Sequence, residues 1–225
     1  MISFIINEKL INIFNEEIVG TKKVPLIIHN SFSDTGIELW EECKRLDCTD
    51  FILVNISNIN WNDEMTPWKC ESLYKSDEGY NGKSDEYILE LTKIIIPQIE
   101  KKLNYKPQYY GLIGYSLGGL FSLYSAYKTD VFKKVASVSG SLWYPDFVNF
   151  VKSNRPLINL EKVYLSLGDK EKISKINLLK DVQINTEEIY EFYKSNGINV
   201  TYELNEGGHF KEVNLRIAKG IKAII

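Results

Sequence analysis

Short apolar runs alternate with longer amphipathic stretches along most of the chain. Three runs, at 24–29, 51–56 and 109–114, are mostly apolar, which is typical of strands buried on both faces. Shorter runs predict strands at 135–138, 163–167 and 199–204. Helical periodicity predicts helices at 35–46, 85–104, 117–127, 186–196 and 212–223. The alternation predicts an α/β fold with a mostly parallel central sheet and helices on both faces.

Turn and capping signals give the expected ends of several elements. Residues 2–14 are expected to form one or two opening strands, with Asn7-Glu8 as a turn. Asp34 is predicted to cap the helix at 35–46, and Ser84 the helix at 85–104. Pro97 predicts a kink inside the second of these helices.

The stretch 57–83 is rich in Asn, Asp, Ser, Gly and aromatic residues and is expected to be a long irregular loop. It starts at the carboxyl end of the strand at 51–56, the edge where parallel sheets build their sites. Loops of this length are uncommon in a compact domain unless they form a site. We therefore expect this loop to frame a pocket.

Composition indicates one enzyme-sized domain over residues 1–225. The chain is 44% apolar with a net charge of -3, so it can bury a large core and carries no basic footprint for nucleic acid or an anionic membrane. Its three cysteines, Cys43, Cys48 and Cys70, form neither an even disulfide set nor a metal-type cluster. With no signal-like opening and no run of about eighteen apolar residues, we expect a cytoplasmic protein.

The pentapeptide Gly114-Tyr115-Ser116-Leu117-Gly118 lies between a predicted strand and a predicted helix. A serine with glycines two residues away on each side fits a sharp strand-to-helix turn that exposes its hydroxyl. The alternative is a Gly-rich turn with a buried serine, but the flanking strand and helix favour a nucleophile.

A serine nucleophile needs an imidazole as base and a carboxylate that orients the imidazole. Of the chain's two histidines, His209 follows a predicted strand near the C-terminus, which suits the chain order serine, acid, histidine. His29 precedes the serine, and a structural role is favoured for it. The acid is expected after the strand at 163–167, where Asp169 and Glu171 compete; the position three residues after Gly168 favours Glu171.

Several segments resemble the putative-esterase branch of the α/β-hydrolase fold, which includes esterase D and ferric-enterobactin-type esterases. They are 114–121, the Ser-Gly-Ser-Leu-Trp segment at 139–143, 165–171 and 208–210, together with Trp61 and Pro67-Trp68, and they spread the resemblance from about residue 22 to the end. The resemblance implies a serine hydrolase with Ser116 as nucleophile, His209 as base and Glu171 as acid. The chain's length implies a small esterase without a lid.

The same resemblance implies an oxyanion hole made of backbone N–H groups. One donor would be Leu117, and the second would lie in the loop after His29, near Ser31 or Phe32. This loop departs from the His-Gly-Gly-Gly run of many lipases and esterases, so the second donor stays open between the two residues. No cofactor or metal is expected, because the acidic pairs 63–64 and 85–86 lack histidine partners and are expected to be solvated.

Aromatic side chains are expected to line the pocket, namely Trp61, Trp68, Trp143 and Tyr144. Trp61 or Trp68 is expected within roughly 10 Å of Ser116, with Trp143 on the opposite wall; Tyr74 and Tyr80 lie in the same set of loops. Hydrolysis of a small-molecule carboxylic ester through an acyl-enzyme on Ser116 is the favoured function. An acyltransferase or thioesterase with the same residues is the alternative, and a non-catalytic binding module is a third. The assembly stays open between a monomer and a homodimer.

Overall fold

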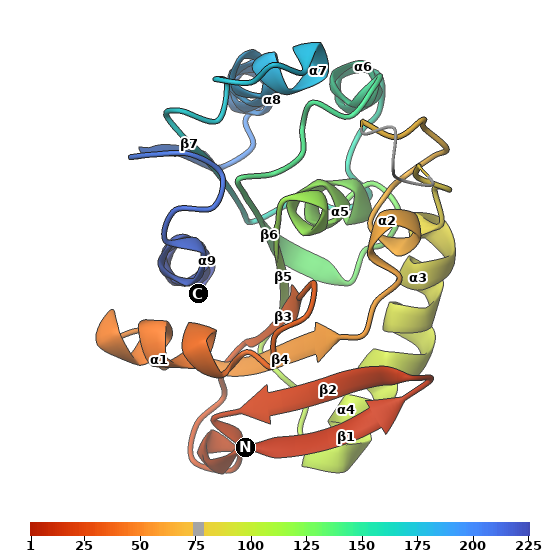
Figure 1. The fold of residues 1–225 in the computed structure, drawn as a ribbon. Coiled ribbons are helices and arrows are strands. Elements are labelled where there is room, and N and C mark those ends of the chain that lie inside the picture. The colour runs from red at the N-terminus through yellow and green to blue at the C-terminus, as the bar shows by residue number, and fades with distance from the viewer. Residues whose placement is uncertain (74–78) are drawn as a thin grey trace.

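Eight strands form one sheet in the computed structural model, which describes residues 1–73 and 79–225 (Figure 1). The strands are β1 (Ile2–Ile6), β2 (Lys9–Phe14), β3 (Leu26–Asn30), β4 (Ile52–Ser57), β5 (Tyr110–Tyr115), β6 (Phe132–Val138), β7 (Lys162–Gly168) and β8 (Val200–Asn205). Their order is β1-β2-β4-β3-β5-β6-β7-β8. β1 pairs antiparallel with β2, and β2 pairs antiparallel with β4, whereas the six strands from β4 to β8 in this order are parallel. The predicted fold class, a mostly parallel α/β sheet, is confirmed.

Helices cover both faces of the sheet (Figure 1). One face packs against α1 (Ile37–Arg45) and α9 (Val213–Ile224). The other face packs against α3 (Ser84–Glu90), η2 (Leu91–Ile95), α4 (Ile96–Leu103), α5 (Leu117–Ser125), α6 (Phe147–Ser153) and α8 (Val182–Ser195). Short helices η1 (Glu16–Ile18), α2 (Trp61–Glu64) and α7 (Asn177–Lys180) lie in connections. Buried apolar residues of β3 and β5 alternate between the two layers, as a strand covered on both sides requires.

The predicted turn at Asn7-Glu8 joins β1 to β2, with both residues at positive φ. The two predicted caps are wrong. The Asp34 carboxylate accepts hydrogen bonds from the Gly36 N–H (2.7 Å) and the Ser31 hydroxyl (2.6 Å), so it orders the loop before α1 rather than capping the helix. Ser84 is the first residue of α3, and its hydroxyl donates to the Glu64 carbonyl.

The helix predicted at 85–104 is continuous but changes its winding in the middle. Residues Leu91–Ile95 form a π-helical turn that ends two residues before Pro97. Proline has no N–H to donate to the carbonyl four residues earlier, and a widened turn accommodates the missing bond.

The loop at 57–83 is organised around Asp63, which is only 7% exposed. Its carboxylate accepts hydrogen bonds from the Asn81 amide (2.7 Å) and the Lys83 ammonium (3.0 Å), near the end of the same loop. The expectation that this acid is solvated is therefore wrong: it closes the loop on itself. Tyr74, one of the expected pocket residues, lies outside the described residues.

The turn from β5 to α5 depends on a very close approach of two backbones. A Cβ on Gly114 would lie 2.2 Å from the backbone of Gly118, closer than any real carbon contact. Between them Ser116 adopts φ 57° and ψ −122°, a strained conformation for a residue with a side chain. The glycines therefore allow the turn, and the turn presents Ser116.

We predict that Gly114→Ala lowers the free energy of unfolding by at least about 2 kcal/mol, because the new methyl group has to displace backbone atoms. Urea titration followed by circular dichroism measures the loss. Gly208→Ala is the matched control, since nothing lies within 4 Å of the position that its methyl group would take, and it should change stability by less than about 0.5 kcal/mol. Equal losses in the two variants would contradict the prediction.

Candidate active site

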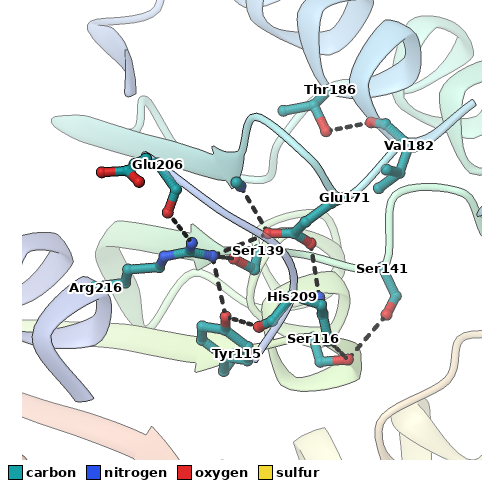
Figure 2. Close-up of polar contacts among 11 residues, drawn as sticks. Tyr115, Ser116, Ser139, Ser141, Glu171, Val182, Thr186, Glu206, His209 and Arg216 are labelled. Atoms are coloured by element: carbon teal, nitrogen blue, oxygen red, sulfur yellow. Dashed lines mark hydrogen bonds and ion pairs between the residues drawn. The ribbon is translucent and has the colours of Figure 1, made fainter. Parts of the chain in front are cut away.

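Three loops at the carboxyl edge of the sheet carry the predicted catalytic side chains (Figure 2). Ser116 follows β5, Glu171 lies in the turn after β7, and His209 lies between β8 and α9. Since parallel neighbours end at the same edge, residues distant in the sequence can meet there.

The structure brings these three side chains together in one hydrogen-bonded chain. The Ser116 Oγ lies 3.1 Å from His209 Nε2, and His209 Nδ1 lies 2.6 Å from Glu171 Oε2. With Nδ1–H donated to the carboxylate, Nε2 is free to accept the serine proton. The His209 side chain is 30% exposed and that of Glu171 4%, so the carboxylate is dry while the imidazole remains in reach of water.

Both oxygens of Glu171 have partners. Oε2 faces His209, while Oε1 accepts hydrogen bonds from the Gly168 N–H (2.7 Å) and from Arg216 Nη1 (3.1 Å). Burial by itself would raise the pKa of Glu171, but the hydrogen bonds and the charge of His209 outweigh it and lower the pKa below the usual value. Glu171 is therefore a carboxylate at neutral pH.

Asp169, the competing acid, contacts the backbone instead. Its Oδ1 accepts a hydrogen bond from the Gly207 N–H (2.7 Å), and its own N–H donates to the Asn205 carbonyl (2.8 Å). These bonds fasten the turn after β7 to the loop that carries His209. Asp169 thus supports the histidine through the backbone, and Glu171 contacts its ring.

His29 is buried at the end of β3, with 2% exposure, and its Nδ1 is 2.7 Å from the Asn55 side-chain oxygen. Burial lowers the pKa of His29, so the ring is neutral. It lies in the wall of a cavity beside Ser116, where its hydrogen bond joins β3 to β4.

The two expected oxyanion donors differ in their surroundings. Leu117 is the first residue of α5, where no carbonyl of the same helix can accept its N–H. The N–H of Ser31 donates to the Ile56 carbonyl (2.8 Å), because the pairing of β3 with β4 continues one residue beyond the strand. This bond rules against Ser31 as the second backbone donor and leaves Phe32, which lines a cavity together with Ser116.

Two cavities meet at Ser116 and His209. The first, of about 280 Å³, is walled by Trp61 and Trp143 and includes Tyr80 of the long loop. The second, of about 330 Å³, lies toward β3 and is lined by Trp61 and Phe32, whose rings meet edge to face at 5.6 Å. Phe210 borders both and is 87% exposed. The loop at 57–83 therefore does contribute walls to the site.

Two of the expected pocket residues lie elsewhere. Trp68 donates its indole N–H to the Pro145 carbonyl (3.1 Å) and packs against an aromatic cluster of Tyr124, Tyr144, Phe147 and Phe150. Tyr144 is 1% exposed, and its hydroxyl donates to the Trp68 carbonyl. Neither is among the described residues that line the two cavities, so both anchor the loop from behind.

Sequence reasoning missed two residues at the site. The Ser141 hydroxyl is 3.3 Å from that of Ser116, and Arg216, only 1% exposed, contacts Glu171. The signal for Arg216 was available: it is a charged residue within the apolar stripe of α9, next to Ile217 and in line with Gly220 and Ile224.

Within residues 1–73 and 79–225, no group of three or more His, Cys, Asp or Glu side chains is placed to hold a metal ion. No helix in the same described part is both long and apolar enough to span a bilayer.

Comparisons with known proteins find similar sequences and similar folds. The protein called Uncharacterized protein YbbA, from Bacillus subtilis (strain 168), is 30% identical over 172 residues, which cover 75% of this chain and 69% of that protein. Among solved structures, an IroE-like serine hydrolase from Shewanella oneidensis has a TM-score of 0.75 at 14% identity, over 95% of this chain and 74% of that one. Siderophore hydrolase EstA from Aspergillus nidulans has a TM-score of 0.72 at 17% identity, over 95% and 88%.

At these identities the solved structures establish the fold alone. The family is established by a family model. The model described as Putative esterase matches residues 37–212, a span that includes Ser116, Glu171 and His209. Because this span covers most of the sequence, the chain belongs to the putative-esterase family.

Proposed function

We propose that this carboxylic-ester hydrolase acts through an acyl-enzyme on Ser116, with His209 as general base and Glu171 as the acid that orients the imidazole. The observation that carries the proposal is the continuous chain Ser116–His209–Glu171, with distances of 3.1 and 2.6 Å, at a strained strand-to-helix turn. Family membership makes the protein an ester hydrolase; the residue roles are our assignment.

In the first half-reaction the Ser116 oxygen attacks the ester carbonyl carbon while His209 Nε2 takes its proton. The resulting oxyanion is held by the Leu117 N–H and the Phe32 N–H. The tetrahedral intermediate collapses, the bond to the alcohol oxygen breaks, and the imidazolium gives its proton to that oxygen. Glu171 stabilises the imidazolium without taking the proton.

In the second half-reaction a water molecule attacks the acyl-enzyme while His209 takes one of its protons. Collapse releases the carboxylic acid and returns the proton to Ser116. The partial exposure of His209 lets water reach the imidazole, as this hydrolytic half-reaction requires.

The cavities favour an ester with apolar or aromatic groups and no negative charge. Trp61, Trp143 and Phe32 offer flat apolar surfaces beside Ser116. No lysine or arginine is among the described residues that line either cavity, whereas Asp34 and Glu171 are. A carboxylate on the substrate would therefore meet negative charge without a cationic partner.

One fold neighbour is titled ferulic acid esterase, a name that refers to an aromatic acid, and this is compatible with an aromatic acyl group here. A cytoplasmic location is part of the proposal, since Cys43, Cys48 and Cys70 are free thiols, as a reducing compartment would keep them. The homodimer stays a prediction.

The first test separates the roles of the two histidines. Ser116→Ala should abolish labelling by a fluorophosphonate probe, and His209→Ala should lower kcat by about 10⁴-fold or more, because the nucleophile loses its base. His29→Ala should keep kcat within about tenfold, since its ring bonds Asn55 and not the serine. Labelling of Ser139 or Ser141, or a larger loss in His29→Ala than in His209→Ala, would overturn the assignment.

Trp61 and Trp68 form a matched pair for testing the pocket. Trp61→Ala should change the relative kcat/KM of short and aromatic p-nitrophenyl esters by about tenfold or more, because Trp61 lines both cavities. Trp68→Ala should instead lower the free energy of unfolding by about 3 kcal/mol with little change in preference, because its ring packs in the aromatic cluster. The opposite pattern would place the pocket elsewhere.

Substrate charge is tested with two esters of equal length. Neutral p-nitrophenyl butyrate should be hydrolysed with a kcat/KM at least about tenfold higher than that of the p-nitrophenyl half-ester of succinic acid, which equals about 1.4 kcal/mol. Spontaneous hydrolysis of each ester is subtracted. Equal rates, or a preference for the half-ester, would show that the cavities accept negative charge.

A further inference from the structure

Arg216 is a buried arginine beside the proposed acid. It lies on α9, on the face that packs against the sheet, and is 1% exposed. Burying a guanidinium costs free energy unless its N–H groups find partners, and an ion pair inside a protein adds little net stability. Its presence in an apolar stripe therefore calls for a role that a leucine could not fill.

The guanidinium contacts four groups at the site (Figure 2). Nη1 donates to Glu171 Oε1 at 3.1 Å, to the Ser139 hydroxyl at 3.2 Å and to the Tyr115 hydroxyl at 3.4 Å. Nη2 donates to the Glu206 carbonyl at 2.9 Å. The arginine thus joins the end of β5 to the loops after β6, β7 and β8 at the edge of the sheet.

These contacts hold both the acid and the histidine. On the acid side, Arg216 and the Gly168 N–H occupy Oε1, so that only Oε2 is left to face His209. On the histidine side, Arg216 holds the backbone at Glu206, and Tyr115, which it contacts, donates its hydroxyl to the carbonyl of His209 itself. The imidazole and the carboxylate are therefore fixed relative to one guanidinium.

We propose that Arg216 is a positioning residue: it orients the Glu171 carboxylate toward His209 and offsets its negative charge. It does not reach the ester, and it acts on the reaction through Glu171 and the His209 loop. The inference rests on the proposed roles of Ser116, His209 and Glu171.

The charge of Arg216 has a consequence with a definite sign. A positive charge beside a carboxylate lowers the proton affinity of the carboxylate. Its removal makes Glu171 hold its proton at higher pH, and the active form needs Glu171 ionised. The acid limb of the kcat/KM profile therefore moves to higher pH when the positive charge at position 216 is removed. It keeps its wild-type position when a positive charge is retained there.

No other cation among the described residues contacts this pair. The other titratable groups around Glu171 and His209 would not replace the positive charge of Arg216. They are Tyr115 on β5, Tyr164 on β7 and Tyr202 on β8, whose pKa values are all raised by burial, and Asp169, which is bonded to the Gly207 N–H. The Glu206 carboxylate is 77% exposed and paired with Lys211.

The test uses Arg216→Met and Arg216→Lys. The control is Lys219→Met, which changes another residue of α9 and removes its partly exposed ion pair with Glu203 of β8. Activity toward p-nitrophenyl butyrate is measured from pH 5 to 9. Arg216→Met should lower kcat by about 100-fold with KM within about threefold, as misplacement of a catalytic group does, and Lys219→Met should match the wild type. The acid limb of Arg216→Met should rise by about 0.5 unit or more, whereas Arg216→Lys should keep the wild-type limb and recover part of kcat.

A second measurement separates positioning from general packing and does not need Arg216→Met to fold. Arg216→Lys is made in the wild type and in Glu171→Gln, and kcat is compared. If Arg216 acts through Glu171, the lysine variant should lower kcat by about tenfold in the wild type and by less than about twofold in Glu171→Gln. Equal losses in both backgrounds, or an unchanged kcat in Arg216→Lys and Arg216→Met, would overturn the proposal.

Failure of the assigned triad gives a different result. In that case Glu171→Gln alone keeps wild-type kcat, and Ser116→Ala remains labelled by the fluorophosphonate. If instead both triad variants lose activity and only the Arg216 series behaves as a packing effect, the triad stands and the positioning role is removed.

Discussion

The close passage of β5 and α5 at Gly114 and Gly118 is the constraint on which the site depends. A side chain at Gly114 would overlap the helix backbone, so the reversal requires glycine there, and the serine in between takes a strained conformation. The reversal places the Ser116 hydroxyl above the edge of the sheet and directs the unbonded N–H groups of the α5 N-terminus to the same point. Only loops that reach this point can take part in the chemistry.

The loops after β7 and β8 reach Ser116 as one unit because polar contacts join them. Asp169 bonds the backbone of the His209 loop, Glu171 bonds the imidazole, and Arg216 from α9 contacts both sides. In a dry environment such contacts are strong and directional, so a carboxylate and an imidazole from separate loops keep one geometry. The turn after β7 therefore contains two acids with different contacts: Asp169 bonds the backbone of the His209 loop, and Glu171 bonds the His209 ring.

The long loop after β4 combines two kinds of packing. Asn81 and Lys83, near its end, bond the Asp63 carboxylate, while Trp68 packs in the aromatic cluster beside α6 and anchors the loop. Trp61, at the start of the loop, is thereby free to face the cleft, where it touches Phe32 and borders both cavities. The aromatic residues of this loop thus serve two purposes: Trp68 anchors the loop, and Trp61 makes the cleft apolar.

Local patterns in the sequence were sufficient for the sheet, the five main helices, the turn at Ser116 and the loops that carry Glu171 and His209, because burial and backbone conformation affect the residue types within a few neighbouring positions. Short α6 and α7 were missed, since seven or four residues carry too little periodicity. The tertiary structure decided three further points: which tryptophan faces the cleft, whether the Ser31 N–H is free, and that Arg216 contacts Glu171. Each depends on a contact between segments far apart in the chain, and the local sequence pattern around a residue does not indicate which distant residue it contacts.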